Sequence, residues 1–487
     1  MAEHLLEGKL HEECGVFGIF RHNGDSVVPE CYHALYALQH RGQESCGIAV
    51  NHQGVISSHK DVGLVSEVFT RQALEKIQEG SIAVAHCRYA TTGSQSRSNA
   101  QPLLVNHLKG QIALAFNGNL TNAVELREQL ELTGAIFHTT SDAEVIAYMI
   151  TRERLRAPSI ESALQSAMQH LQGAFSIVVM SPSKLLAARD PHGFRPLCMG
   201  NLNGDIVFAS ESCALDAIGA QLMRDVAPGE VIRVSAEGVQ SYQTSDQTRT
   251  AMCIFEYIYF ARPDSVMEGV SVHETRLRAG SYLALEHPVA ADIVIGVPDS
   301  GLDAAMGFSR QSGIPYGVGF IKNRYIGRTF IAPTQRERAS AVRIKLNVLK
   351  INVKGKRVVL VDDSIVRGTT ARRIAGLLRE AGATEIHMRL SSPPFIAPCY
   401  FGTDIDDRKN LMAYNHSLEE MRQIIGVDSL GFLSVDACDK IAAGARIGFC
   451  KGCFTNNYPA PIPSEGRKLR FEQPLTSQEE AANEVKQ

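Results

Sequence analysis

The chain has 487 residues, which is too long for a single hydrophobic core, so we expect two or three domains. Its formal net charge of only -3 gives no general reason to expect nucleic acid or a membrane surface as a partner. No apolar run is long enough to span a bilayer, and residues 1–13 lack the apolar segment of a secretory signal. We therefore expect a cytoplasmic protein, in which the 11 cysteines are buried, catalytic or metal-bound instead of disulfide-bonded.

The first half of the chain, from about Cys14 to Ser235, consists largely of short β-like runs. Examples begin at Gly15, Ile82, Ile112 and Phe175. One helix is expected after Ser141, a plausible N-cap, because the residues that follow it form an apolar stripe: Ala143, Ile146, Ala147 and Ile150. A polar segment over 241–250 predicts a linker or an exposed hairpin.

Strand and helix patterns alternate from about 269 to 435, with strand-like runs at 293–297, 357–361 and 386–390. This alternation predicts a parallel α/β sheet. From about Ser464 the chain is charged and weakly hydrophobic, which predicts a mobile tail. We thus expect a propeptide over 1–13, a first domain over 14–240, a linker over 241–268, a second domain over 269–463 and a tail over 464–487.

The run Val358 to Val361 ends abruptly in Asp362 and Asp363, and a loop containing Arg367-Gly-Thr-Thr370 follows. An apolar strand, a loop and then a helix direct backbone N–H groups and a positive helix end towards one point, which favours a phosphate. The two carboxylates would repel that phosphate unless they bind sugar hydroxyls or a shared Mg²⁺. An ordinary turn capped by one Asp would explain neither the second acid nor the loop.

Cys14 stands immediately before a β-like run, close to the start of the chain. A terminal residue carries an α-amino group with a pKa of about 7.7 to 8, which can take a proton from its own side chain. Removal of residues 1–13 as a propeptide would therefore place a nucleophile and a base in one residue. Taken alone, a cysteine at a strand start is more often a buried filler.

Two sets of short motifs resemble known families. The first set resembles the glutaminase domain of the N-terminal-nucleophile amidotransferases, with an αββα sandwich: Cys14-Gly-Val-Phe-Gly, Gln39-His-Arg-Gly-Gln43, Arg88-Tyr-Ala-Thr91, Asn117-Gly-Asn119 and Thr140-Ser-Asp142. The second resembles the type I phosphoribosyltransferases: Gly296-Val-Pro-Asp-Ser300, Lys322 to Phe330 and Val361 to Thr370. In this order, from about Cys14 to Pro459, they resemble the glutamine phosphoribosylpyrophosphate amidotransferase family, which catalyses the first committed step of purine synthesis.

The resemblance implies that Cys14 attacks the side-chain amide of glutamine, forming a thioester and releasing ammonia. The Asn117 amide and the Gly118 N–H would form the oxyanion hole. Glutamine would be held at both ends by complementary groups: Arg88, Thr91 and Asp142. Cys87 has apolar neighbours and is expected to be inert.

The resemblance further implies that ammonia displaces pyrophosphate at C1 of the ribose. The residues that would bind phosphoribosylpyrophosphate are Lys322, Asp362, Asp363, Ser364, Arg367, Gly368, Thr369 and Thr370, with Ser300, Asp362 and Asp363 as Mg²⁺ ligands. A basic run follows Lys322 and predicts a lid over the leaving pyrophosphate: Arg324, Arg328, Arg336, Arg338, Arg343 and Lys345.

Cys450-Lys-Gly-Cys453 has metal-ligand spacing but supplies only half of a four-cysteine site. From spacing alone the candidates for the other half are Cys253, Cys399 and Cys438, and either zinc or an iron-sulfur cluster is possible. The family resemblance implies a [4Fe–4S] cluster on four cysteines: Cys253, Cys399, Cys450 and Cys453.

Two other functions fit parts of the sequence. A glutaminase could serve another acceptor, as in glucosamine-phosphate or asparagine synthetases, but those relatives lack the Asp-Asp loop. A non-catalytic phosphoribosylpyrophosphate-sensing regulator would leave Cys14, Arg88, Asn117 and Asp142 without a purpose, and the chain shows no basic DNA-binding module. The family resemblance also implies purine nucleotides as feedback inhibitors and a homotetramer.

Overall fold

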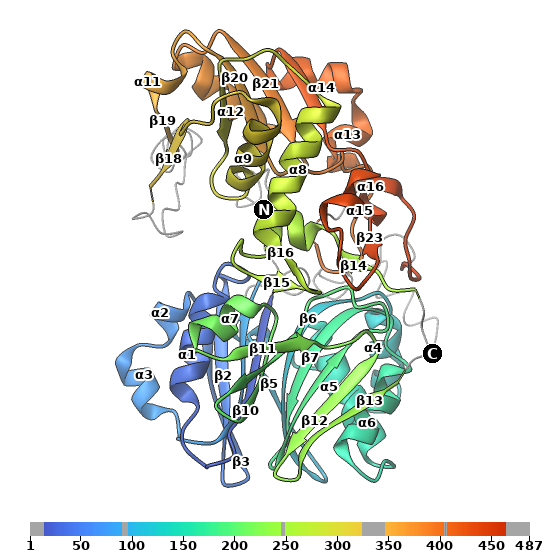
Figure 1. The fold of residues 1–487 in the computed structure, drawn as a ribbon. Coiled ribbons are helices and arrows are strands. Elements are labelled where there is room, and N and C mark those ends of the chain that lie inside the picture. Colours follow the sequence, from blue (N-terminus) through green and yellow to red (C-terminus); the bar gives the residue numbers. More distant parts are fainter. Residues whose placement is uncertain are drawn as a thin grey trace. The chain divides into compact units, whose positions relative to one another are not determined.

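A computed structural model describes residues 14–89, 96–244, 249–323, 346–403, 405 and 407–463. These residues form two compact units (Figure 1). The sandwich unit contains 14–252, the short segment Tyr400–Thr403 and 459–463; the parallel-sheet unit contains 253–399, 405 and 407–458. Within this described part, no helix is long and apolar enough to cross a membrane.

The sandwich unit contains two antiparallel sheets. The first has the order β11 (Gln221–Asp225), β9 (Cys198–Leu202), β10 (Asp205–Ala209), β1 (Gly15–Phe20), β4 (Ile82–Arg88), β2 (Ser45–His52) and β3 (Val55–Val62). The second has the order β13 (Gly238–Gln243), β12 (Glu230–Ser235), β8 (Lys184–Arg189), β7 (Gly173–Met180), β6 (Gly110–Leu120) and β5 (Leu103–His107). β13 therefore uses three residues of the segment expected to be a linker.

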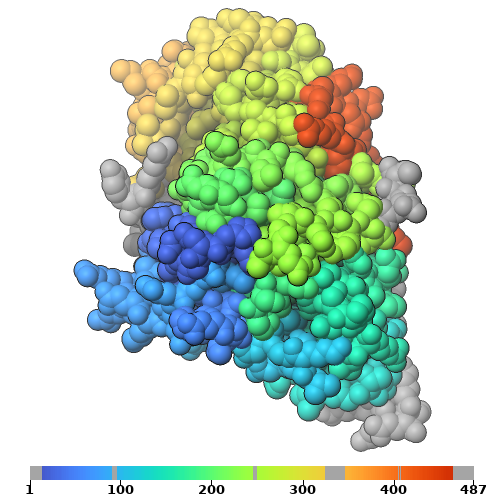
Figure 2. Space-filling model, turned by 60° about the horizontal axis from the view of Figure 1, so that its bottom comes forward, coloured from blue at the N-terminus to red at the C-terminus, as the bar shows by residue number. Residues whose placement is uncertain are grey.

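Helices cover the outer faces of both sheets. α1 (Val28–Ala37) packs on the first sheet together with α7 (Ser212–Ala217), and the blue region that holds α1 lies beside the green region that holds α7 in the space-filling view (Figure 2). The short helices α2 (Val65–Val68) and α3 (Arg71–Lys76) follow β3. The second sheet carries α4 (Ala123–Glu131), α5 (Asp142–Arg154) and α6 (Ile160–Met168).

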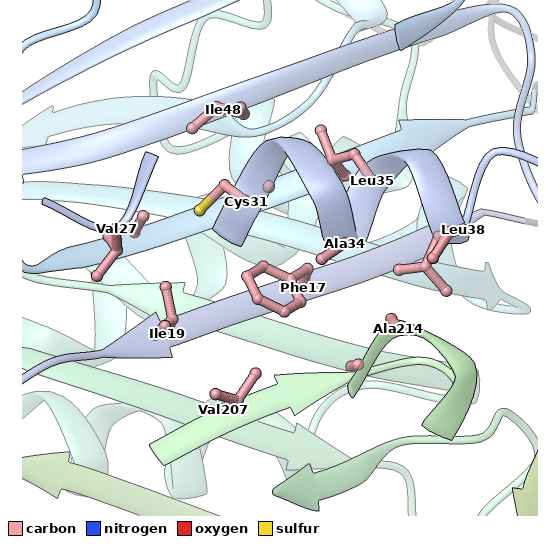
Figure 3. Close-up of a cluster of buried hydrophobic side chains, with 14 of the residues drawn as sticks. Phe17, Ile19, Val27, Cys31, Ala34, Leu35, Leu38, Ile48, Val207 and Ala214 are labelled. Carbon is pink, nitrogen blue, oxygen red and sulfur yellow. The ribbon is translucent and has the colours of Figure 1, made fainter. Parts of the chain in front are cut away.

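Side-chain alternation along the strands builds three apolar layers. On β1, Phe17 and Ile19 face α1, where Cys31 and Leu35 pack against them (Figure 3). Val16 on the other face of β1 belongs to the layer between the two sheets. Because successive side chains of a strand point to opposite faces, each central strand serves two cores. The αββα sandwich expected from the family resemblance is confirmed.

The parallel-sheet unit is built on four parallel strands in the order β17 (Ile293–Gly296), β20 (Arg357–Asp362), β21 (Glu385–Leu390) and β22 (Ser429–Phe432). Its longer helices are α8 (Val272–Glu286), α9 (Gly301–Ser312), α12 (Thr369–Glu380) and α14 (Leu418–Ile425). The predicted helix after the Asp-Asp loop is confirmed: Ile374 and Leu378 of α12 are buried on the sheet. Fully covered parallel strands explain the continuous apolar runs.

Shorter elements complete the second unit. They are β15 (Val266–Met267), β16 (Val270–Ser271), β18 (Phe320–Lys322), β19 (Leu346–Val348), α11 (Lys350–Val353), α13 (Met412–Asn415) and α15 (Ala437–Ile441). β14 (Met252–Cys253) pairs with β23 (Phe449–Cys450), and α16 (Gly452–Thr455) follows. A π-helical turn spans Glu256–Phe260 and a 3₁₀ turn spans Arg408–Asn410, whereas the 3₁₀ turn Arg97–Asn99 belongs to the sandwich unit.

Candidate active sites

Three predicted glutaminase residues are in register with side chains of the apolar layer between the two sheets. Arg88 and Asn117 are each an even number of residues away from an inter-sheet core residue on the same strand, Val84 and Ala115. Cys14 directly precedes β1 and is two residues before the inter-sheet residue Val16. Gly15 pairs with Cys87, so Cys14 and Arg88 are neighbours across β1 and β4. The register of β1 and β4 therefore brings Cys14 and Arg88 side by side, and Asn117 lies on β6 of the other sheet.

Further hydrogen bonds fix β6 against β4 at the same end. His86 Nε2 lies 2.9 Å from the Phe116 carbonyl oxygen, and the Phe116 N–H donates to Gln101 Oε1 at 2.8 Å. His86 and Phe116 are close in sequence to Arg88 and Asn117, so these bonds hold the two site residues at one end of the sandwich. Burial lowers the pKa of His86 to about 3, so the ring is neutral.

Cys14 is held through both its backbone and its side chain. Its thiol donates to the Tyr89 carbonyl oxygen at 3.4 Å, and its own carbonyl oxygen accepts from Arg41 Nε at 3.1 Å. Arg41 also donates to Glu211 Oε1 at 2.6 Å, and both side chains are fully buried. A buried ion pair of this kind fixes the residue that it holds, because loosening it would leave a charge uncompensated.

Sequence reasoning did not find the roles of Arg41 and Glu211. Arg41 belongs to the quoted Gln39–Gln43 motif, but the motif does not say which backbone atom its guanidinium reaches. Glu211 lies 170 residues further along the chain, and it also contacts His40 Nε2 at 2.8 Å. Only the pairing of β1 with β10, which α7 follows, brings this carboxylate to Arg41.

Asn117 has the features expected of an oxyanion donor. Its side chain is 1% exposed, and within the described residues its Nδ2 is buried with no hydrogen-bond partner. Buried donors are normally satisfied, so an unsatisfied one in a native fold suggests a missing ligand. Gly118 has φ +143, and a Cβ there would stand 2.0 Å from the Ala174 carbonyl oxygen. Only glycine can adopt this backbone conformation at this position of β6.

The two groups expected to hold the ends of glutamine are buried in the same unit. Arg88 is 3% exposed, and its Nη1 lies 3.9 Å from Glu44 Oε2. Asp142 begins α5 and is 7% exposed; its Oδ2 accepts from the Leu120 N–H at 2.9 Å. Ser141 caps α5 as predicted, by accepting from the Ala143 N–H at 3.3 Å. Thr91 lies outside the described residues.

Cys87 is fully buried, as expected from its apolar neighbours. Burial raises the pKa of its thiol well above the ordinary value. A thiol in this state is a poor nucleophile, so Cys87 is expected to be inert.

In the parallel-sheet unit, the predicted magnesium ligands come together at the carboxyl end of β20. The Ser300 hydroxyl donates to Asp363 Oδ2, and the Ser364 hydroxyl donates to Asp363 Oδ1 at 2.5 Å. The Asp363 N–H donates to Asp362 Oδ1 at 3.0 Å, and both carboxylates are buried. Hydroxyl and carboxylate oxygens are the hard ligands that Mg²⁺ prefers, so this set fits the ion.

The remaining phosphoribosyl residues surround the start of α12. Gly368 is its N-cap with φ +77, and Thr369 and Thr370 form its first turn. Arg367 is exposed, and Lys322 on β18 makes an ion pair with Asp299 at 2.5 Å. The helix start thus carries open N–H groups beside hydroxyls, as phosphate binding requires. The predicted basic lid, Arg324 to Lys345, lies outside the described residues.

Cys453 has the other three cysteines of the predicted cluster in its neighbourhood. The pKa of the Cys453 thiol is raised well above its ordinary value, first by burial and then by the neighbouring thiols of Cys399, Cys253 and Cys450. The Cys453 carbonyl oxygen also accepts from the N–H groups of Ile396 and Ala397 at 3.0 and 3.1 Å. Four soft sulfur ligands fit an iron-sulfur cluster or zinc. Among the described residues, no group of three or more His, Cys, Asp or Glu side chains has the arrangement of a metal site.

Cys438, the alternative ligand left open by spacing, lies in α15. It is fully buried, and its thiol contacts the Ser434 carbonyl oxygen at 3.8 Å. Burial raises the pKa of this thiol to about 12. The structure therefore groups Cys453 with the other three cysteines and gives Cys438 a core position.

Sequence comparisons identify both units. A family model described as a glutamine amidotransferase domain matches residues 86–217, and one described as a phosphoribosyl transferase domain matches residues 283–390. The chain is 48% identical over 464 residues to an amidophosphoribosyltransferase of Synechococcus elongatus, covering 94% of each. An amidophosphoribosyltransferase of Bacillus subtilis is 46% identical, with 93% of this chain and 95% of the relative covered.

Comparison with solved structures agrees. The chain is similar to the glutamine phosphoribosylpyrophosphate amidotransferase of B. subtilis complexed with ADP and GMP, with a TM-score of 0.86, 45% identity, and coverage of 93% of this chain and 98% of that one. A structure described as the allosteric regulatory enzyme of purine biosynthesis gives a TM-score of 0.88 at 44% identity, covering 95% and 100%.

Proposed function

The chain belongs to the amidophosphoribosyltransferase family, and from this premise we propose that it makes 5-phosphoribosylamine from glutamine and phosphoribosylpyrophosphate. Glutamate and pyrophosphate are the other products, and the reaction is the first committed step of de novo purine synthesis. The geometric observation that carries the glutaminase half is the unpartnered, buried Nδ2 of Asn117 among the described residues, at the same end of the sandwich as Cys14. The alternative of a non-catalytic regulator finds no support in the relatives.

In the glutaminase step, the Cys14 sulfur attacks the side-chain amide carbon of glutamine. Removal of residues 1–13 would give Cys14 a free α-amino group, which takes the thiol proton and passes it to the leaving ammonia. Asn117 Nδ2 and the Gly118 N–H stabilise the oxyanion, each donor being worth about 3 to 4 kcal/mol. Arg88 binds the α-carboxylate of glutamine, and Asp142 and Thr91 bind its ammonium end. Water then hydrolyses the thioester to glutamate.

In the transferase step, ammonia attacks C1 of the ribose and pyrophosphate leaves. Ser364 to Thr370 hold the 5-phosphate at the start of α12, and the carboxylates of Asp362 and Asp363 hold the ribose hydroxyls. Ser300, Asp362 and Asp363 would hold Mg²⁺, which when bound neutralises charge on the pyrophosphate. Lys322 and the basic run after it supply further positive charge for the leaving group.

Incubation of the purified chain with both substrates tests this function. Glutamate and pyrophosphate should appear in equal amounts, and neither glutamine nor phosphoribosylpyrophosphate alone should support synthesis. Glutamine hydrolysis that proceeds without pyrophosphate release, whatever sugar phosphate is added, would contradict the proposal and leave a glutaminase with another acceptor.

We also propose that Cys253, Cys399, Cys450 and Cys453 hold a [4Fe–4S] cluster with a structural or oxygen-sensing role, since neither half-reaction is a redox step. The proximity of the other three thiols to Cys453 supports a shared ligand set. An anaerobic preparation should be brown, contain about four irons per chain and bleach in air. A colourless preparation with one zinc per chain would contradict the cluster and favour a structural zinc site.

Regulation and assembly extend the same proposal. The B. subtilis structure is complexed with ADP and GMP, and we propose that purine nucleotides inhibit this enzyme, that it forms a homotetramer and that it works in the cytoplasm. Sedimentation should give four times the mass of one chain, and added GMP or ADP should lower the rate of synthesis. A monomer that is indifferent to both nucleotides would contradict these points.

A further inference from the structure

One short segment of the second half of the chain belongs to the sandwich unit. Tyr400–Thr403, which we call the strap, is assigned to this unit, whereas the described residues before and after it are assigned to the other. Phe401 and Thr403 are buried. These four residues are part of the packing of the sandwich unit. A simple connector would not need to be buried in this way.

The receiving surface is a loop of the sandwich unit, built from Asp190 to Arg195. The Phe401 carbonyl oxygen accepts from Arg195 Nε at 2.9 Å, and the Phe401 ring stacks on Phe194 with centroids 4.2 Å apart and planes 16° from parallel. The Asp190 carboxylate braces this loop by accepting from the Gly193 N–H at 2.8 Å and the Phe194 N–H at 3.0 Å. Arg195 is fully buried, and its hydrogen bonds to the strap offset the free-energy cost of burying its charge.

The strap also contacts the strand that carries the oxyanion residues. Asn119 Nδ2 donates to the Tyr400 carbonyl oxygen at 3.0 Å and lies 3.4 Å from the Leu120 carbonyl oxygen. Both neighbours are acceptors, so the amide nitrogen must face them. In the described part of the chain, the buried Oδ1 of Asn119 then has no hydrogen-bond partner. Asn119 is two residues from Asn117, and the next N–H, of Leu120, binds Asp142.

We propose that the strap is a positioning element of the glutaminase site, and that Asn119 is the residue through which it acts. The Tyr400 carbonyl fixes the Asn119 amide so that Oδ1 is presented as an acceptor to an N–H donor of the bound glutamine. When the strap loosens, Nδ2 loses this partner, the amide turns, and glutamine loses one hydrogen bond. The inference rests on the proposed glutaminase function and adds a residue contributed from the second half of the chain.

Gly402→Ala tests the role of the strap without touching Asn119. Gly402 has φ +117, and a Cβ there would stand 2.7 Å from Arg195 Nη2, so alanine strains the backbone of the strap and must shift either the strap or the Arg195 guanidinium that binds it. Gly204→Ala is the matched control, because Gly204 has φ +103 in the same unit with open space around it. We expect Gly402→Ala to raise the KM for glutamine about tenfold, because glutamine loses one hydrogen bond. The control should change this KM by less than about twofold.

Ammonia-dependent synthesis separates a positioning role from general damage. It should stay within about twofold of wild type in Gly402→Ala, with the KM for phosphoribosylpyrophosphate unchanged. Asn119→Asp keeps the acceptor but loses the donor to Tyr400, so it should also raise the KM for glutamine. The double variant should raise it by less than the product of the two effects, because both substitutions break the same contact.

An unchanged KM for glutamine in Gly402→Ala, or a parallel loss of ammonia-dependent synthesis, would overturn the inference, as would effects that multiply in the double variant. If Gly402→Ala does not fold, Phe401→Leu loosens the same strap by removing the ring stack, and an unchanged KM there has the same meaning. A wild-type chain that does not use glutamine would instead contradict the proposed function.

Discussion

The two sites of this chain are built on different kinds of framework. In the sandwich unit, Cys14, Arg88 and Asn117 sit on or beside regular strands, and their directions are set by alternation and by backbone hydrogen bonds. In the parallel-sheet unit, Asp363 and its hydroxyl partners Ser300 and Ser364 follow the ends of strands. A site on strands is already shaped for its substrate, whereas a site on loops can close around one.

Because the two sites lie in different units, a substitution can inactivate one half-reaction and leave the other intact. Glutamine cleavage depends on a nucleophile and an oxyanion hole within one unit, and ribose amination depends on oxygen ligands within the other. Ammonia supplied from outside replaces the first site but not the second. Comparing glutamine-dependent with ammonia-dependent synthesis therefore assigns any substitution to one unit.

The largest effect is expected from Cys14→Ala. Glutamine-dependent synthesis should fall by at least about a thousandfold, because no other group forms the thioester. Ammonia-dependent synthesis should remain within about twofold of wild type. Cys87→Ala is the matched control, since it removes the adjacent buried thiol; it should retain both activities. Loss of both activities in Cys14→Ala would show that the sites are not separable.

Asn117→Ala should lower the kcat for glutamine hydrolysis by about a hundredfold to a thousandfold, with a much smaller change in KM, because its Nδ2 acts on the oxyanion and not on the ground state. Asn51→Ala is a suitable control. Asn51 is another buried amide of this unit, whose Nδ2 donates to the Pro182 carbonyl oxygen at 2.6 Å, so its loss should affect stability alone. Equal falls in kcat for both variants would remove Asn117 from the oxyanion hole.

Asp363→Asn should give the opposite pattern to Cys14→Ala. Both modes of synthesis should fall by about a hundredfold, since a ligand charge for Mg²⁺ is lost, while glutamine hydrolysis continues. Asp292→Asn is the control, because Asp292 pairs with Arg357 at the opposite end of β20. If ammonia-dependent synthesis survives in Asp363→Asn, the carboxylate is not part of the transferase site.

The smallest effect concerns acid stability of the sandwich unit. Because the pKa of His86 is about 3 in the fold and about 6.5 in an unfolded chain, the unfolded state binds the extra proton between these values. The free energy of unfolding should therefore fall as the pH drops from about 6.5 towards 3, by a few kcal/mol at most. Urea titrations at several pH values should show a weaker dependence for His86→Gln; an identical dependence would contradict this assignment.

Much of the fold was predictable because strand and helix periods are local properties. The apolar runs at β1, β4, β6, β7 and β20 and the cap at Ser141 all follow from neighbouring residues. The polar segment from 241 left a linker and an exposed hairpin open, and the antiparallel pairing of β13 with β12 agrees with the hairpin for residues 241–243.

The supporting contacts of the sites could not be predicted. Glu211 reaches Arg41, and Tyr400 reaches Asn119, across 170 and 281 residues of sequence. No spacing or period connects such positions, since the contacts arise only when two sheets and a returning segment are packed. The catalytic residue types were readable from motifs, whereas the residues that orient them required the tertiary structure.

The most direct test of the account is the mass of the N-terminal peptide of the purified, active enzyme. Cys14 can act as an N-terminal nucleophile only if its α-amino group is free, so we predict that the active chain begins at Cys14. An enzyme that is fully active with glutamine but still begins at Met1 or Ala2 would contradict the mechanism, because Cys14 would then have no amine to take its proton.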